Sequence, residues 1–164
     1  MSGKGRSEAR SVARLGAVQA LYQIEMIGAD TGAVIEEFLE HRLGETLDGV
    51  ALGDADRELF RTLVAGTMAE RDDLDDMLAA VLAEGWPVER LEAILRAILR
   101  CGAYEIGYCD EIPPKVSITE YVRLTETFFE GKEPGMANAV LDKLAHSLWP
   151  EEMEATPPCP ANSN

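Results

Sequence analysis

Apolar residues recur at three- and four-residue spacing along most of this chain, and that spacing limits the fold more than any other feature. The stretch EARSVARLGAVQALYQIEM is typical, because a helix turns by about 100° per residue and therefore places Leu15, Val18, Tyr22 and Met26 on one face. Glycine and proline interrupt the pattern, and no segment alternates as a strand would. Helices are expected at residues 8–27, 31–43, 54–69, 72–84, 87–108, 116–129 and 136–148. The sequence predicts an all-α protein of about seven helices.

The length of 164 residues allows a single hydrophobic core that buries roughly 70% of the unfolded chain's surface. We expect a flexible basic N-terminus over residues 1–7 and a helical domain over residues 8–149. The glycine at position 85 predicts a subdivision into two groups of helices. Residues 150–164, PEEMEATPPCPANSN, are acidic and proline-rich and are expected to be disordered.

Several classes of protein are disfavoured by composition. No apolar run approaches the roughly 20 residues that cross a bilayer, and the N-terminus lacks the apolar core of a signal peptide, so a cytoplasmic location is expected. Cys101, Cys109 and Cys159 show neither zinc spacing nor a disulfide framework and are interpreted as reduced thiols. His41 and His146 have no third ligand or catalytic partner at a recognisable spacing. We expect no metal, no cofactor and no enzymatic activity.

A basic stripe at the N-terminus contrasts with the rest of this acidic chain. The net charge is −15, yet the first fourteen residues carry Lys4, Arg6, Arg10 and Arg14 against Glu8 alone. Positive charge near the N-terminus of a helix opposes the helix dipole, and an anionic ligand would offset that penalty. The alternative is that the arginine stems only cover apolar neighbours. The stripe therefore indicates either a local anion site or a solvated helix face.

Four collinear stretches resemble the NusB family of transcription antitermination factors. They are AVQALYQ after the arginine-bearing start, ILRAILRCGAYEI (94–106), EIPPKVSITEYVRL (111–124) and MANAVLDKLA (136–145). The resemblance spans about residues 6–148 and implies two packed helical bundles. It also implies binding of boxA RNA together with NusE, a small-subunit ribosomal protein, within an antitermination complex on RNA polymerase. No catalysis and no cofactor are implied.

The resemblance also suggests which residues meet RNA. The implied contacts are Lys4, Arg6, Arg10, Arg14, Gln19, Arg100, Lys132 and Met136. Some relatives have an unbroken run of arginines where this chain has Ser11 and Val12, and some have phenylalanine where it has Met136. A thioether has no aromatic face, so base stacking at Met136 would be weaker. Gln19 has an open alternative, a hydrogen bond to a backbone carbonyl, and core packing is the alternative for Tyr22.

Two other functions are compatible with these residues. A NusB-like domain also precedes the catalytic domain of ribosomal RNA cytosine methyltransferases, but that architecture needs several hundred more residues and a glycine-rich cofactor loop. The second alternative is a helical scaffold that binds only protein. Homodimerisation is left open, because relatives include both monomers and dimers.

Overall fold

The computed structural model describes residues 3–43, 46–47, 50–51, 55–83 and 86–154. Its α-helices are α1 (Gly3–Ile27), α2 (Thr31–Glu37), α3 (Arg57–Ala69), α4 (Arg71–Val81), α5 (Ala93–Tyr108), α6 (Pro114–Phe128), α7 (Glu133–Leu148) and α8 (Pro150–Glu154). The shorter elements are a π-helical turn η1 (Phe38–Arg42), a 3-10 turn η2 (Val88–Arg90) and the strands β1 (Thr46–Leu47) and β2 (Val50–Ala51). The expected all-α class is confirmed. None of the described helices is long and apolar enough to cross a membrane.

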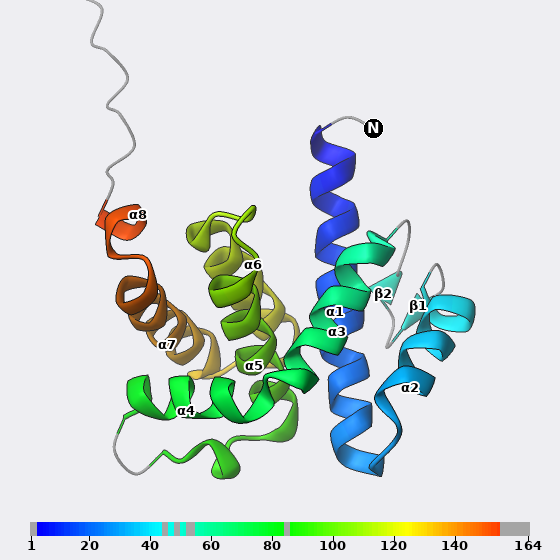
Figure 1. Ribbon diagram of the computed structural model, residues 1–164, viewed down its shortest axis with the longest axis horizontal. Coiled ribbons are helices and arrows are strands. Elements are labelled where there is room, and N and C mark those ends of the chain that lie inside the picture. The colour runs from blue at the N-terminus through cyan, green and yellow to red at the C-terminus, as the bar shows by residue number, and fades with distance from the viewer. Residues whose placement is uncertain (1–2, 44–45, 48–49, 52–54, 84–85, 155–164) are drawn as a thin grey trace, which may run out of the picture.

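The helices form two groups that lie side by side (Figure 1). The first group contains α1, α2 and α3, and the second contains α4, α6, α7 and α8. Helix α5 packs against α1 and α3 of the first group and against α4, α6 and α7 of the second. The hydrophobic core is therefore continuous through α5.

Helix α5 can occupy this central position because most of its surface is apolar and some of its neighbours are small. Ile98, Leu99 and Cys101 are fully buried. A methyl group added to Gly66 of α3 would lie only 2.1 Å from Cζ of Tyr104, so α3 can approach α5 here only with glycine. The all-round apolar pattern of this segment thus indicates a helix surrounded by others.

Local signals explain where several helices begin and end. Asp30 and Asp56 are N-caps whose carboxylates accept hydrogen bonds from the backbone N–H groups of Ala33 at 3.0 Å and Leu59 at 2.9 Å. Gly28 follows α1 with φ of 64°, a left-handed conformation that glycine adopts without steric cost. The end of α1 and the beginning of α2 lie where the sequence predicts them, whereas α3 begins at Arg57 rather than at residue 54.

The secondary structure differs from the sequence-based expectation in three places. Residues 3–7, expected to be flexible, form the first turns of α1. The helix expected over 87–108 is divided into η2 and α5, and the Arg96 side chain donates to the carbonyls of Val88 and Leu91 at this break. The pair β1 and β2 was not expected; it aligns Thr46 with Ala51. The subdivision expected at residue 85 lies outside the described residues.

The C-terminal boundary also differs from the expectation. Residues 150–154, expected to be disordered, form α8, and Met153 is only 9% exposed. The preceding Trp149 donates its indole N–H to the carbonyl of Ile106 at 2.8 Å, which fixes this end of the chain against α5. Residues 155–164 of the expected tail lie outside the described residues.

Candidate nucleic-acid interface

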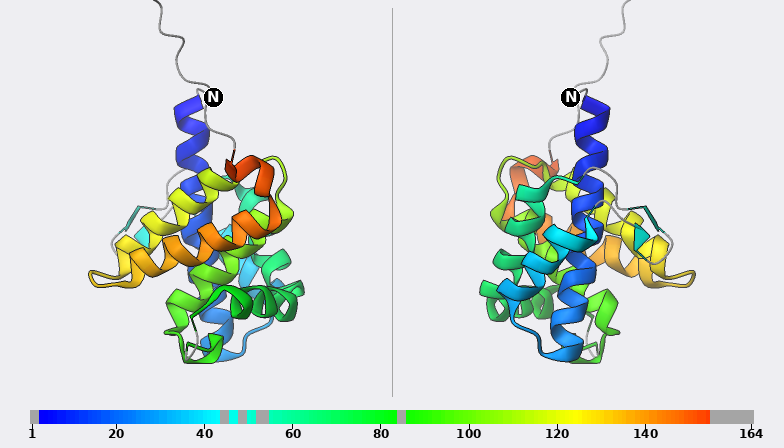
Figure 2. Two further views of the ribbon diagram at one scale, coloured as in Figure 1. Left: turned by 90° about the vertical axis from the view of Figure 1, so that its left-hand side faces the viewer. Right: turned by 90° about the vertical axis from the view of Figure 1, so that its right-hand side faces the viewer.

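The first turns of α1 extend beyond the body of the protein (Figures 1 and 2). Lys4 and Arg6 are exposed on these turns. Arg10 is 36% exposed, and its Nε lies 4.0 Å from a carboxylate oxygen of Asp56. An exposed ion pair at that distance contributes little to stability. These three basic side chains are therefore accessible to an anionic ligand.

The structure buries Arg14, although the resemblance implies that this residue contacts RNA. Its side chain is only 2% exposed, and its Nε donates to Oε1 of Glu105 at 2.8 Å. A carboxylate oxygen of Glu120, on α6, lies 3.8 Å from Nη1 of Arg14. Four residues of helix turn the direction of a side chain by about 40°, so Arg14 is rotated by about 80° from Arg6. That rotation carries Arg14 from the surface into the interface with α5 and α6, where RNA cannot reach it.

Arg14 belongs to a buried polar network. The Glu105 carboxylate also accepts hydrogen bonds from the hydroxyls of Ser117 and Tyr121, the latter at 3.2 Å. Burial lowers the pKa of the Arg14 guanidinium, but the hydrogen bond and charge of Glu105 outweigh it and leave the pKa raised. Burial raises the pKa of the nearby Cys101 thiol to about 12. The network joins α1, α5 and α6 and sets the direction in which α1 extends.

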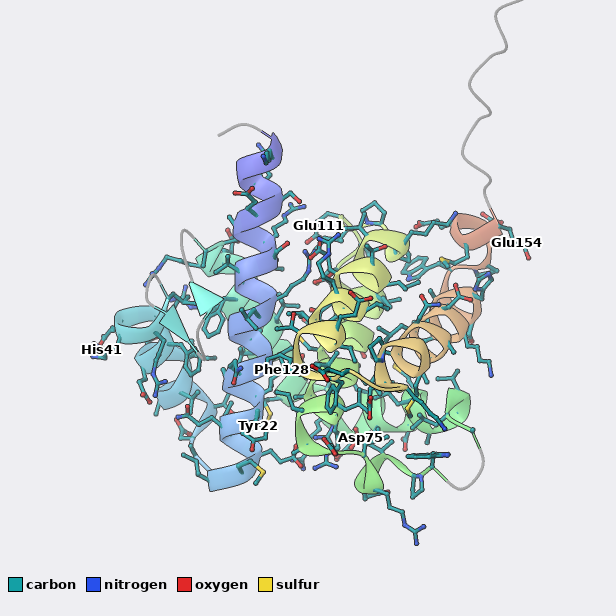
Figure 3. All side chains as sticks on the ribbon, turned by 180° about the vertical axis from the view of Figure 1, so that it is seen from behind. Tyr22, His41, Asp75, Glu111, Phe128 and Glu154 are labelled. Carbon is teal, nitrogen blue, oxygen red and sulfur yellow. The ribbon has the colours of Figure 1, made fainter. Side chains whose placement is uncertain are left out.

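Arg100 carries two acidic neighbours that the sequence did not suggest. Its Nε and Nη2 donate to the two carboxylate oxygens of Asp75 at 2.7 and 2.8 Å, and Nη1 lies 3.4 Å from Glu25. Glu25 also pairs with Arg96. Asp75 lies on α4, on the side seen in Figure 3. Because Arg100 is 15% exposed and paired in two-point geometry, a phosphate would have to displace Asp75.

The side chains of α1 beyond Arg14 are divided between core and surface. Gln19 is partly buried, and Tyr22 is 37% exposed. Figure 3 shows Tyr22 on α1 and Phe128 at the end of α6 in the same view as Asp75. Tyr22 therefore does not take the core position that was its alternative.

Lys132 and Met136 line a groove that we call the α4–α7 groove. Its volume is about 660 Å³, and it is formed by the end of α4, the chain through η2, the start of α5 and the start of α7. Trp86 lines the same groove and is 55% exposed. The sequence alone did not indicate a functional role for Trp86. The feature that could have indicated such a role is a large aromatic residue next to proline and glycine, because a loop rather than the core is expected there.

No group of three histidine, cysteine or acidic side chains could hold a metal ion within the described part of the chain. His41 lies 3.6 Å from Glu40, and His146 lies 3.4 Å from Asp142, each on the protein surface. Cys101 and Cys109 are buried free thiols.

These features define a two-group helical protein with a basic, extended first helix. The chain belongs to the NusB family, whose family model matches residues 11–146. It is 44% identical to transcription antitermination protein NusB of Maricaulis maris, over 91% of this chain and 93% of that protein. As a member of this family, it is not an enzyme.

Two solved structures share the fold. NusB of T. maritima is 28% identical, with a TM-score of 0.71, and the match covers 89% of this chain and 97% of that one. A structure of antitermination factors NusB and NusE in complex with double-stranded RNA matches with a TM-score of 0.71 and 21% identity, over 85% of this chain and 98% of that one. At that identity, the second likeness supports the fold alone.

Proposed function

We propose that this protein is an RNA-binding transcription antitermination factor. With NusE it binds boxA RNA of ribosomal RNA leaders in the cytoplasm and supports processive transcription of ribosomal RNA operons. The observation that carries the proposal is the exposed basic end of α1 on a chain that belongs to the NusB family.

Charge distribution supports RNA binding at this end of the protein. RNA approaching a chain of net charge −15 is repelled by most of its surface, whereas Lys4, Arg6 and Arg10 provide a local attraction. These side chains contact phosphates in the proposal, and phosphate contacts position the strand without reading its sequence. Arg14 is a positioning residue, because its ion pair with Glu105 holds the helix that carries the other three.

The part of the protein beyond the basic end of α1 carries the remaining RNA contacts of the proposal. Gln19, Arg100, Lys132 and Met136 are the proposed further RNA contacts, and Arg100 becomes available when it exchanges Asp75 for a phosphate. NusE extends the RNA-binding surface, so the pair binds RNA more tightly than this acidic protein does alone. The solved complex that contains NusB and NusE provides the precedent for this partnership.

The decisive experiment is a titration of boxA RNA and of a scrambled RNA of equal length, each with and without NusE, at several salt concentrations. We expect the pair to prefer boxA and to bind it more tightly than this protein alone at the same salt. Arg10→Ala should lower the affinity for both RNAs by similar factors, because phosphates carry no sequence information. Arg61→Ala, which removes an exposed arginine of α3, is the matched control. Binding of NusE without any binding of RNA would instead identify a protein-only scaffold.

A further inference from the structure

The α4–α7 groove presents an aromatic ring that the packing of the protein leaves uncovered. Trp86 is 55% exposed, although full burial of an aromatic ring stabilises a fold more than burial of most other side chains. The groove places this ring together with Met136, Leu91 and Val140. A volume of about 660 Å³ is within the roughly 300–1,000 Å³ of small-ligand sites. The groove thus matches a planar group in size better than it matches a folded domain.

The charged residues of the groove favour a nucleic-acid ligand. Arg90, Lys132 and Lys143 line it, and Glu92 and Glu133 partly offset them. The balance is positive, whereas the chain as a whole is strongly negative.

We propose that Trp86 stacks on a nucleobase of bound single-stranded RNA in the α4–α7 groove, while Lys132, Lys143 and Arg90 meet the adjacent phosphates. The inference rests on the proposed RNA-binding function and deepens it. Met136 has no ring, so the aromatic surface of this groove comes from the loop before η2 instead. Stacking tolerates any base, because every base has an aromatic face. Trp86 therefore contributes affinity rather than sequence preference.

The two tryptophans of this chain make the proposal directly measurable. Trp149 is partly buried and donates to the carbonyl of Ile106, whereas Trp86 is exposed. In Trp149→Phe, all tryptophan emission comes from Trp86. We expect boxA RNA, in the presence of NusE, to quench that emission with the same concentration dependence as binding measured by anisotropy of labelled RNA. If Trp149→Phe does not fold, the same signal is obtained as the difference between the wild type and Trp86→Phe.

Substitutions at Trp86 separate stacking from simple apolar contact. Trp86→Leu should weaken boxA binding by roughly 5- to 150-fold, whereas Trp86→Phe, which retains a ring, should stay much closer to the wild type. An oligonucleotide with the same backbone but abasic positions keeps its phosphates and loses its bases. It should bind the wild type more weakly than intact boxA, and Trp86→Leu should reduce that difference.

Four results would overturn the inference. RNA binding with unchanged Trp86 emission, or with equal affinity for Trp86→Leu, would leave the RNA-binding function intact and remove Trp86 from it. A change of emission caused by NusE alone, with no further change on adding RNA, would identify the groove as a protein-binding surface. Absence of RNA binding by the wild type, seen in the anisotropy measurement itself, would refute the proposed function together with the inference.

Discussion

Replacement of Arg14 distinguishes a buried structural arginine from an RNA contact. Removing one partner of a buried ion pair leaves an uncompensated charge and costs about 3–5 kcal/mol. Arg14→Ala leaves Glu105 buried with only the Ser117 and Tyr121 hydroxyls as donors. For a chain of this size, a loss of 1 kcal/mol lowers Tm by about 2–4 °C. We therefore expect Tm, followed by circular dichroism, to fall by roughly 6–20 °C.

The matched comparison is Arg10→Ala, which removes an arginine one helical turn away. Its free energy of unfolding should change by less than about 0.5 kcal/mol, as for other surface substitutions. Its plot of log affinity for RNA against log salt should become shallower by about 0.7. The slope of Arg14→Ala, measured at a temperature where it is folded, should equal that of the wild type. Arg14→Met combined with Glu105→Gln should be more stable than Arg14→Met alone, because no charge is then left unpaired. An unchanged Tm for Arg14→Ala with a shallower salt slope would refute this assignment.

Three further predictions test the other parts of the structure. Asp75→Asn should strengthen RNA binding, measured by titration, because it releases Arg100. Asp76→Asn removes the same charge from an exposed position and should have a smaller effect. Equal effects of the two substitutions would mean that net charge alone is responsible. Truncation after α8 should leave Tm unchanged, whereas truncation before α8 should lower it, because Met153 is buried; the two Tm values check this. Burial raises the pKa of the Cys101 thiol to about 12, so this thiol stays protonated at pH 9, whereas an unfolded cysteine is about half ionised at that pH. The folded protein should therefore resist alkylation at Cys101 until denaturant is added.

Local features of the chain were predictable because they depend on neighbouring residues only. Helical periodicity located the main helices, and Gly28 marked the end of α1. The role of Arg14 was not predictable in this way, because its partner lies 91 residues further along the chain. Periodicity placed Arg14 beside Arg10, but only the packing of α1 against α5 determines which of the two is covered.

The candidate site shows the same division between local and tertiary information. The exposed Lys4 and Arg6 follow from charge and position alone. The pairing of Arg100 with Asp75 requires α4 and α5 to lie together, and the neighbouring residues of Asp75 in the sequence do not indicate this contact. Composition also misjudged residues 150–154, because their order depends on the burial of Met153.

The central position of α5 has a consequence for how this protein unfolds. Because α5 supplies core side chains to both helical groups, separation of either group would expose buried residues of α5. Neither group is therefore an independent cooperative unit, and fragments made by cutting the chain between them would each lack half of a core. We therefore expect amide hydrogens in the middle of α5 to exchange with solvent only through global unfolding, so that their exchange rates measure the stability of the entire molecule.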